Sequence, residues 1–300
     1  MRLLRSCIAL AALAALPALP AAAQTAAPDP QTIMAASRAA LGAATPVQTL
    51  ELSGAYRLQP LGSQQQQQGT LDLRFGAGRQ YQRNFSLRLP FGQMQMTQTL
   101  DGDTVWSKRQ FPGGGGRFRG FQRRGRTLSP EQRAAFQKRM EARMKQALVA
   151  QWARGQMEFL LQPPPGATLR YAGLAKARNG MTADMIAVSD PAWGATASPV
   201  TLFLDTHSHR LLMVSYSGLA PRAFARFRRG AAPGAGDGSR PPRPQPQTVY
   251  VHLTHWRQVQ GHWFPFEITQ SSGGQTFAEW EIKQASVNSP KLTARVFQKP

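Results

Sequence analysis

Histidine is the residue type whose spacing in this chain comes closest to that of a metal or catalytic site. His207 and His209 form a His-x-His pair in a predicted turn, and two imidazoles at this spacing can bind a metal ion. Asp205 is the one further ligand type beside them, which leaves the pair short of a full ligand set. His252 and His255 are three apart on a predicted strand, which directs them to opposite faces. The sequence therefore predicts no metal site.

Other catalytic patterns are also missing from the sequence. No serine stands in a nucleophile-elbow sequence, and no Gly-Lys-Ser/Thr follows the four glycines at 113–116. The chain has 15 Asp and Glu among 300 residues, too few to favour a paired-carboxylate hydrolase. We expect no catalytic residue, no cofactor and no enzymatic activity. An extracytoplasmic enzyme with an unfamiliar site at His207 or His209 stays open as an alternative.

Aromatic and methionine side chains are better candidates for function, because they could line an apolar cavity. Acyl chains enter such a cavity by the hydrophobic effect, which contributes about 0.8 kcal/mol per buried CH₂. Methionine adapts to varied apolar shapes. For each of these residues, ordinary core packing is the commoner role. The candidate lining residues are Tyr56, Phe85, Met94, Met96, Trp106, Met140, Met144, Phe264, Phe266 and Trp280.

Most of these candidates stand on predicted β-strands. Apolar residues alternate with polar ones in many short segments, and a period of two indicates strands with one covered face. The later strands are predicted at 168–174, 183–189, 200–205, 210–217, 249–257, 262–270 and 275–287. In total about a dozen strands follow one another, mostly in hairpin order. A mainly β fold with a strongly curved antiparallel sheet is expected.

Two helices accompany the strands. Asp29 and Pro30 predict the start of a short helix that runs to Gly42. Ser129 begins a capping box, after which a long helix is expected to bend or end at Gly155. Its apolar stripe favours either ordinary packing on the sheet or an adaptable plug over a lipid-sized cavity, and both can hold together. The stripe consists of Phe136, Met140, Met144, Ala147, Leu148 and Trp152.

The N-terminus predicts export. Residues 1–23 have a short basic start, an apolar stretch and a small-residue cleavage pattern, which together are typical of a cleaved signal peptide. Cys7 lies within this segment, so the mature chain at 24–300, expected to be a single domain, has no cysteine. No later segment is long and apolar enough to cross a bilayer. A periplasmic location is therefore expected.

Charge is the other unusual property of the chain. The formal net charge is +21, with 36 Lys and Arg. Mutational bias accounts for part of this excess, and attraction to anionic surfaces is the functional interpretation. Two basic insertions, at about 109–127 and 220–247, are expected to be disordered. Contacts with an anionic head group or a partner are assigned to Arg117, Arg119, Arg123 and Arg124.

The order of segments resembles the periplasmic lipoprotein carriers of the LolA/LolB type, and in particular the outer-membrane lipoprotein-sorting proteins. The shared landmarks are TLELSGAYRL, TLDGDTVW, LRYAGLAK, TLFLDTHSHRLLMVSYS, WRQVQGHWFPFEIT, GGQTFAEWEIKQASVN and VFQKP. The resemblance implies a half-open β-barrel of about eleven strands that is capped by helices and holds an apolar cavity for acyl chains. The two basic insertions depart from it.

These observations predict a periplasmic binding or carrier protein that holds a lipid or a lipoprotein acyl chain. The alternative is a non-transporting interaction or stress-sensing module of the cell envelope on the same scaffold. The expected partners are the acyl chain and, through the basic segments, an anionic membrane surface or an envelope protein. Export argues against a nucleic-acid partner, and a monomer is expected.

Overall fold

The structure is a computed structural model that describes residues 27–42, 46–89, 92–112, 129–177, 180–193, 199–219, 221 and 245–299. The expected signal peptide and most of both basic insertions lie outside these ranges. The same holds for the four arginines assigned there to partner contacts.

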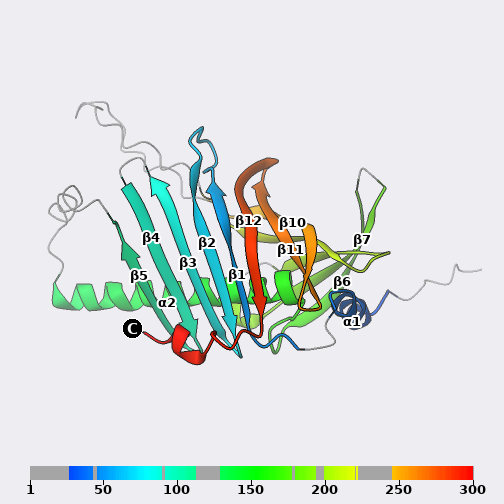
Figure 1. The fold of residues 1–300 in the computed structure, drawn as a ribbon, viewed down its shortest axis with the longest axis horizontal. Coiled ribbons are helices and arrows are strands. Elements are labelled where there is room, and N and C mark those ends of the chain that lie inside the picture. Colours follow the sequence, from blue (N-terminus) through cyan, green and yellow to red (C-terminus); the bar gives the residue numbers. More distant parts are fainter. Residues whose placement is uncertain are drawn as a thin grey trace, which may run out of the picture.

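One antiparallel sheet of twelve strands organises the described residues (Figure 1). The strands are β1 (Leu50–Leu58), β2 (Gln67–Gly76), β3 (Gln80–Leu89), β4 (Gly92–Asp101), β5 (Thr104–Gln110), β6 (Thr168–Lys176), β7 (Thr182–Ser189), β8 (Val200–Asp205), β9 (Leu211–Gly218), β10 (Gln247–Val259), β11 (His262–Ser272) and β12 (Gln275–Val287). Their order is β5-β4-β3-β2-β1-β12-β11-β10-β9-β8-β7-β6. The predicted mainly β, antiparallel fold is thus confirmed, with twelve strands where the resemblance implied about eleven.

The sheet is curved and open. Its edge strands are β5 and β6, which do not pair with each other in the described chain. Every neighbouring pair is consecutive in sequence except β1 and β12, whose pairing joins the two halves. Asn288 fixes this junction: its side-chain Oδ1 accepts hydrogen bonds from the N–H groups of Gln48 and Thr49, at 2.7 and 3.2 Å.

Period-two alternation gives the sheet an inner face, which packs against the long helix α2 (Pro130–Leu160), and an outer face. Leu52 and Leu73 lie opposite each other on the inner face and are buried. The last residues of the chain cover part of the outer face. There a 3₁₀ turn, η4 (Ala294–Phe297), accepts hydrogen bonds from the side chains of Gln82 and Trp106, at 2.9 and 3.1 Å. A second 3₁₀ turn, η3 (Pro191–Trp193), follows β7.

Both predicted helix starts are confirmed. The helix α1 (Pro30–Ala40) begins after Asp29, whose carboxylate accepts hydrogen bonds from the N–H groups of Gln31 and Thr32. The helix α2 begins after Ser129 with the predicted capping box, in which the Ser129 hydroxyl and the Gln132 side chain each accept a backbone N–H.

Of the two alternatives predicted for Gly155, an end of α2 there is wrong, because the helix continues to Leu160. Packing explains the glycine instead. A Cβ at position 155 would lie 2.4 Å from Cζ of Phe75, so only glycine lets the helix approach the sheet this closely. The residue that caps the helix after Leu160 is Leu161, which has a left-handed backbone with φ 49°.

The two halves of α2 have different surroundings. Leu148, Trp152, Met157 and Phe159 in its second half are buried against the inner face. Residues 130–143 in its first half are all exposed. Figure 1 shows this half continuing beyond the edge strand β5. Of the predicted apolar stripe, Leu148 and Trp152 are buried and Met144 is half-buried, whereas Phe136, Met140 and Ala147 are exposed.

Candidate functional site

A cavity of about 310 Å³ lies between the second half of α2 and the inner face of the sheet. This volume is at the lower end of the range of ligand pockets, ~300–1,000 Å³. Strands from both halves of the sheet supply an apolar wall of aliphatic and aromatic side chains. The wall consists of Leu71, Leu73, Phe75, Val249, Ile268, Phe277 and Trp280.

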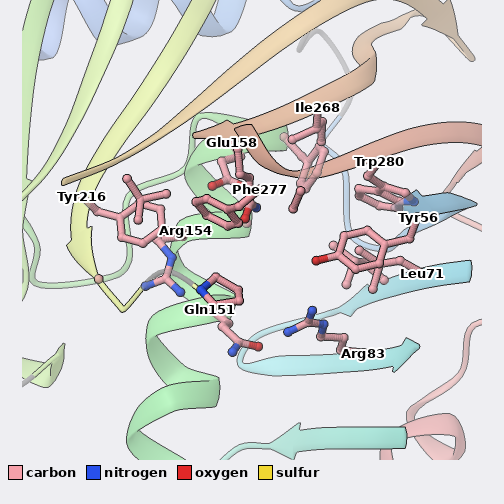
Figure 2. A pocket seen from close by; sticks show the side chains of 18 of the residues that line it. Tyr56, Leu71, Arg83, Gln151, Arg154, Glu158, Tyr216, Ile268, Phe277 and Trp280 are labelled. Atoms are coloured by element: carbon pink, nitrogen blue, oxygen red, sulfur yellow. The ribbon is translucent and has the colours of Figure 1, made fainter. Parts of the chain in front are cut away.

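The opposite wall is polar. Gln151, Arg154 and Glu158 share one face of α2, because they are three and four residues apart. Arg83 on β3 faces them from the sheet, and Figure 2 shows its guanidinium and that of Arg154 directed into the cavity. The cavity is therefore amphipathic, whereas the resemblance implied an apolar cavity for acyl chains.

The two guanidinium groups have aromatic neighbours and, among the described residues, no carboxylate partner. The Arg154 carbon Cζ lies 4.3 Å from the ring centroid of Tyr216, and that of Arg83 lies 5.1 Å from the ring of Phe85. Within the described ranges, neither arginine forms an ion pair within 4 Å. Two positive charges in the cavity lining are thus available to an anion.

Two polar atoms of the lining have no hydrogen-bond partner among the residues of the described chain. They are the Oε1 acceptor of Gln151 and the Nε1–H donor of Trp280, and both are buried. A buried polar group without a partner costs about 1–3 kcal/mol. A ligand that supplies an acceptor to Trp280 and a donor or a bridging water to Gln151 would offset this cost.

Burial sets the protonation of the other polar groups. It raises the pKa of Tyr81 to about 12 and raises the pKa values of Tyr56 and Tyr216, so these hydroxyls remain protonated donors. Burial also raises the pKa of the Glu158 carboxyl to about 6, against a smaller opposing effect of the Arg154 charge. Glu279, at the same cavity, pairs instead with Arg57 at 3.2 Å.

Of the ten residues predicted to line a cavity, Tyr56 and Trp280 lie at this one. Phe85, Met94 and Met96 share the inner face on β3 and β4, nearer the β5 edge, where Phe85 is opposite Met96. The strand register places them on one face, but they do not line the cavity of about 310 Å³.

The remaining predicted residues lie elsewhere. Trp106 is on the outer face, because its partner position on β4 is Thr99, whose hydroxyl meets the outward-facing Gln82. Met140 is 49% exposed, and Met144 is half-buried at the margin of the core. Phe264 borders a separate hollow beside α1, and Phe266 is covered by the guanidinium of Arg257 at 4.7 Å.

Sequence reasoning missed the polar wall. Arg83 stands two residues before Phe85 on the same strand, and this spacing indicated an inward direction. Gln151, Arg154 and Glu158 stand at or beyond the end of the predicted apolar stripe. The stripe gave no indication that polar side chains in this part of the helix would face the sheet. Only the approach of α2 to β3 brings these four residues together.

The histidines do not gather into a metal site. Asp205 accepts hydrogen bonds from the backbone N–H groups of His207 and Ser208, which makes it a turn residue. His255 pairs with Glu267 on the neighbouring strand. Throughout the described part of the chain, no three His, Cys, Asp or Glu side chains come close enough to hold a metal ion.

Comparison with known proteins gives structural likeness only. No family model matches the sequence, and no curated protein is similar to it. Three solved structures share the arrangement over 90% of this chain and 97–98% of theirs. They are a LolA superfamily protein of Nitrosomonas europaea (7% identity, TM-score 0.47), a DUF1329 family protein of Desulfovibrio piger (10%, 0.48) and a putative outer membrane lipoprotein-sorting protein domain of Vibrio parahaemolyticus (8%, 0.45).

Two of these three structures carry the family names that the segment order already suggested. At such identities and TM-scores the likeness supports no statement on ligand or activity, so the functional argument rests on the cavity itself. No helix of the described ranges combines the length and the apolar character that a membrane span requires.

Proposed function

We propose that this chain is a periplasmic binding or carrier protein for an anionic amphiphile, a molecule with an acyl tail and a carboxylate or phosphate head. The observation that carries the proposal is the pair of cavity arginines, Arg83 and Arg154, which face an apolar wall and have no carboxylate partner in the described chain.

The acyl tail would lie against the apolar wall of the cavity. Leu71, Ile268 and Phe277 come from three strands of both halves of the sheet, so a tail lying between them contacts the β1–β12 junction. Each buried CH₂ contributes about 0.8 kcal/mol, so even a tail that enters only in part binds measurably. The volume of about 310 Å³ favours one tail over several.

The head would lie between β3 and α2. The guanidinium groups of Arg83 and Arg154 donate charge-assisted hydrogen bonds, and the protonated Tyr56 hydroxyl adds a neutral donor. Arg154 is held by the Tyr216 ring, which keeps the guanidinium in place before a ligand arrives. Leu219 lines the cavity just after β9 and is 64% exposed, so a ligand would enter beside it.

A displacement titration tests this function. The mature protein is loaded with a fluorescent fatty acid, which is displaced by a fatty acid, a lysophosphatidic acid and the fatty alcohol of the same chain length. We expect both acids to displace the probe at concentrations about tenfold or more below that of the alcohol, because hydrogen bonds to a charged group contribute about 1.5–3 kcal/mol. The relative strength of the two acids identifies the head group.

Substitution of the cavity arginines supplies the control. Arg83→Gln and Arg154→Gln should each weaken binding of the acids and leave binding of the alcohol nearly unchanged. Arg88→Gln is the matched control variant, since Arg88 is exposed on the same strand and its side chain points to the outer face of the sheet. Equal displacement by acid and alcohol in the wild-type protein, or no displacement by any of the three, would refute the proposal.

A further inference from the structure

The exposed first half of α2 has an apolar stripe that no element of the described residues covers. Phe136 is 54% exposed and Met140 is 49% exposed, and both belong to the few large apolar side chains that the described chain leaves at its surface. They are four residues apart, so they lie on one face of the helix, and Met144 continues this face toward the sheet. Exposed apolar residues that form a stripe indicate a binding surface.

Charge around the stripe is predominantly positive. At 3.6 residues per turn, Arg133, Arg139 and Arg143 fall within or beside the stripe. Glu141 borders the stripe on the flank opposite Arg139, and Glu131 and Lys138 fall on the far side of the helix. Three arginines and one glutamate therefore lie within or beside the stripe, so its surroundings carry a net positive charge. Apolar side chains flanked by arginine are typical of helices that lie in the interface of an anionic membrane.

The helix is held so that this half stands free of the sheet. Lys145 pairs with Asp103 in the β4–β5 turn at 3.0 Å, and Arg79 reaches the same carboxylate at 3.6 Å. This contact is where α2 leaves the sheet, and residues 130–143 before it are exposed on all sides. The capping box at Ser129 stabilises the outer end as helix.

We propose that the segment 130–143 of α2 binds the surface of a bilayer that contains anionic phospholipid, with Phe136 and Met140 inserted among the lipids and the flanking arginines at their phosphates. A second copy of this chain is a poorer occupant, because pairing two such faces would bring six arginines together. This inference is independent of the cavity, which lies at the other half of the helix.

Vesicle co-sedimentation tests the proposal with the full mature chain. The vesicles contain phosphatidylcholine alone or phosphatidylcholine with one quarter phosphatidylglycerol, in low salt. We expect binding to the anionic vesicles and at least tenfold weaker binding to the neutral ones. In R139Q/R143Q, binding should fall by about thirtyfold, since each basic residue near such a surface contributes about 1 kcal/mol. In F136S/M140S it should fall by about tenfold or more.

The control variant is K138Q/A142S, which changes the exposed face away from the stripe and should bind within about twofold of the wild-type protein. All three variants should keep the wild-type unfolding midpoint and the wild-type fatty-acid displacement, because the changed side chains are exposed. Two results overturn the proposal: wild-type protein that does not bind anionic vesicles, or equal binding by the wild-type, R139Q/R143Q and F136S/M140S proteins. A dimer that F136S/M140S abolishes, without vesicle binding, would assign the stripe to a second copy instead.

Discussion

Glu158 makes the stability of the fold depend on pH in a direction opposite to that of most surface carboxylates. Its carboxyl is surrounded by protein in the cavity wall, although part of the side chain keeps solvent contact. Burial raises its pKa from 4.5 to about 6, and Arg154 offsets only part of this effect. The folded protein therefore binds the proton more tightly than the unfolded chain does.

The size of the effect follows from that difference. A shift of one pKa unit corresponds to about 1.4 kcal/mol, so ionised Glu158 lowers the free energy of unfolding by about 2 kcal/mol. The penalty is absent below pH 4.5, grows as the pH rises through about 6, and is complete above it. Glu158→Gln, which is uncharged at every pH, should therefore be about 2 kcal/mol more stable than the wild-type protein at pH 7.5. At pH 4 the two proteins should differ little.

Urea unfolding followed by tryptophan fluorescence at pH 4 and pH 7.5 measures this difference. Glu131→Gln is the matched control, because Glu131 is exposed on the same helix, and its effect should stay within about 0.5 kcal/mol at both pH values. The free energies of unfolding of Glu158→Gln and the wild-type protein could instead differ by the same amount at pH 4 and pH 7.5. The Glu158 carboxyl would then be solvated in the folded protein, and its assigned burial in the cavity wall would be incorrect.

Three further predictions concern the scaffold. Gly155→Ala should destabilise the protein by about 1–3 kcal/mol in thermal or urea unfolding, because the new methyl group meets the Phe75 ring. In a Phe75→Leu background the same change should cost less than about 1 kcal/mol, and an unchanged cost would contradict the assigned contact. Asn288→Ala should lower the free energy of unfolding by about 2–3 kcal/mol, because it removes the hydrogen bonds to Gln48, Thr49 and the carbonyl of Pro46. Asn288→Gly should lose less stability than Asn288→Ala, since residue 288 has φ 50°, which glycine adopts more readily than alanine. Equal losses in the two variants would show that the backbone conformation at 288 does not affect stability. Ser129→Ala should speed amide exchange in the first turns of α2 about fivefold while the global unfolding midpoint stays within error; a large drop in the midpoint would mean that this half of the helix is packed after all.

Local patterns were sufficient for the strands. The segments 200–205 and 275–287 were predicted with the bounds that the structure has, because turn residues flank them, although the buried neighbours Phe277 and Ala278 interrupt the alternation in the second segment. The helix starts were also predictable, since Asp29 and Ser129 act on backbone groups within three residues. Gly155 misled the prediction because its reason lies across the core, in the position of Phe75, and not in the helix itself.

The cavity was predicted less well than the strands, for a physical reason. Periodicity indicates which face of a strand is covered, as it did for Tyr56 and Trp280, but it does not indicate how far a covering helix extends. The first half of α2 extends beyond the sheet, so Met140 is exposed and not part of the core. The second half of the helix places Arg154 and Glu158 at the same cavity as Arg83. The outward direction of Trp106 depended on the β4–β5 register, which the short turn after Asp101 sets.

Native mass spectrometry of the mature chain purified from a bacterial envelope tests the central claim most directly. We expect one bound amphiphile per chain, identified after extraction as a molecule with a single acyl tail and an acidic head, and we expect R83Q/R154Q to lose it while R88Q keeps it. A wild-type protein that carries no amphiphile and accepts none when fatty acid is added, or one that binds only neutral lipids, would contradict the account.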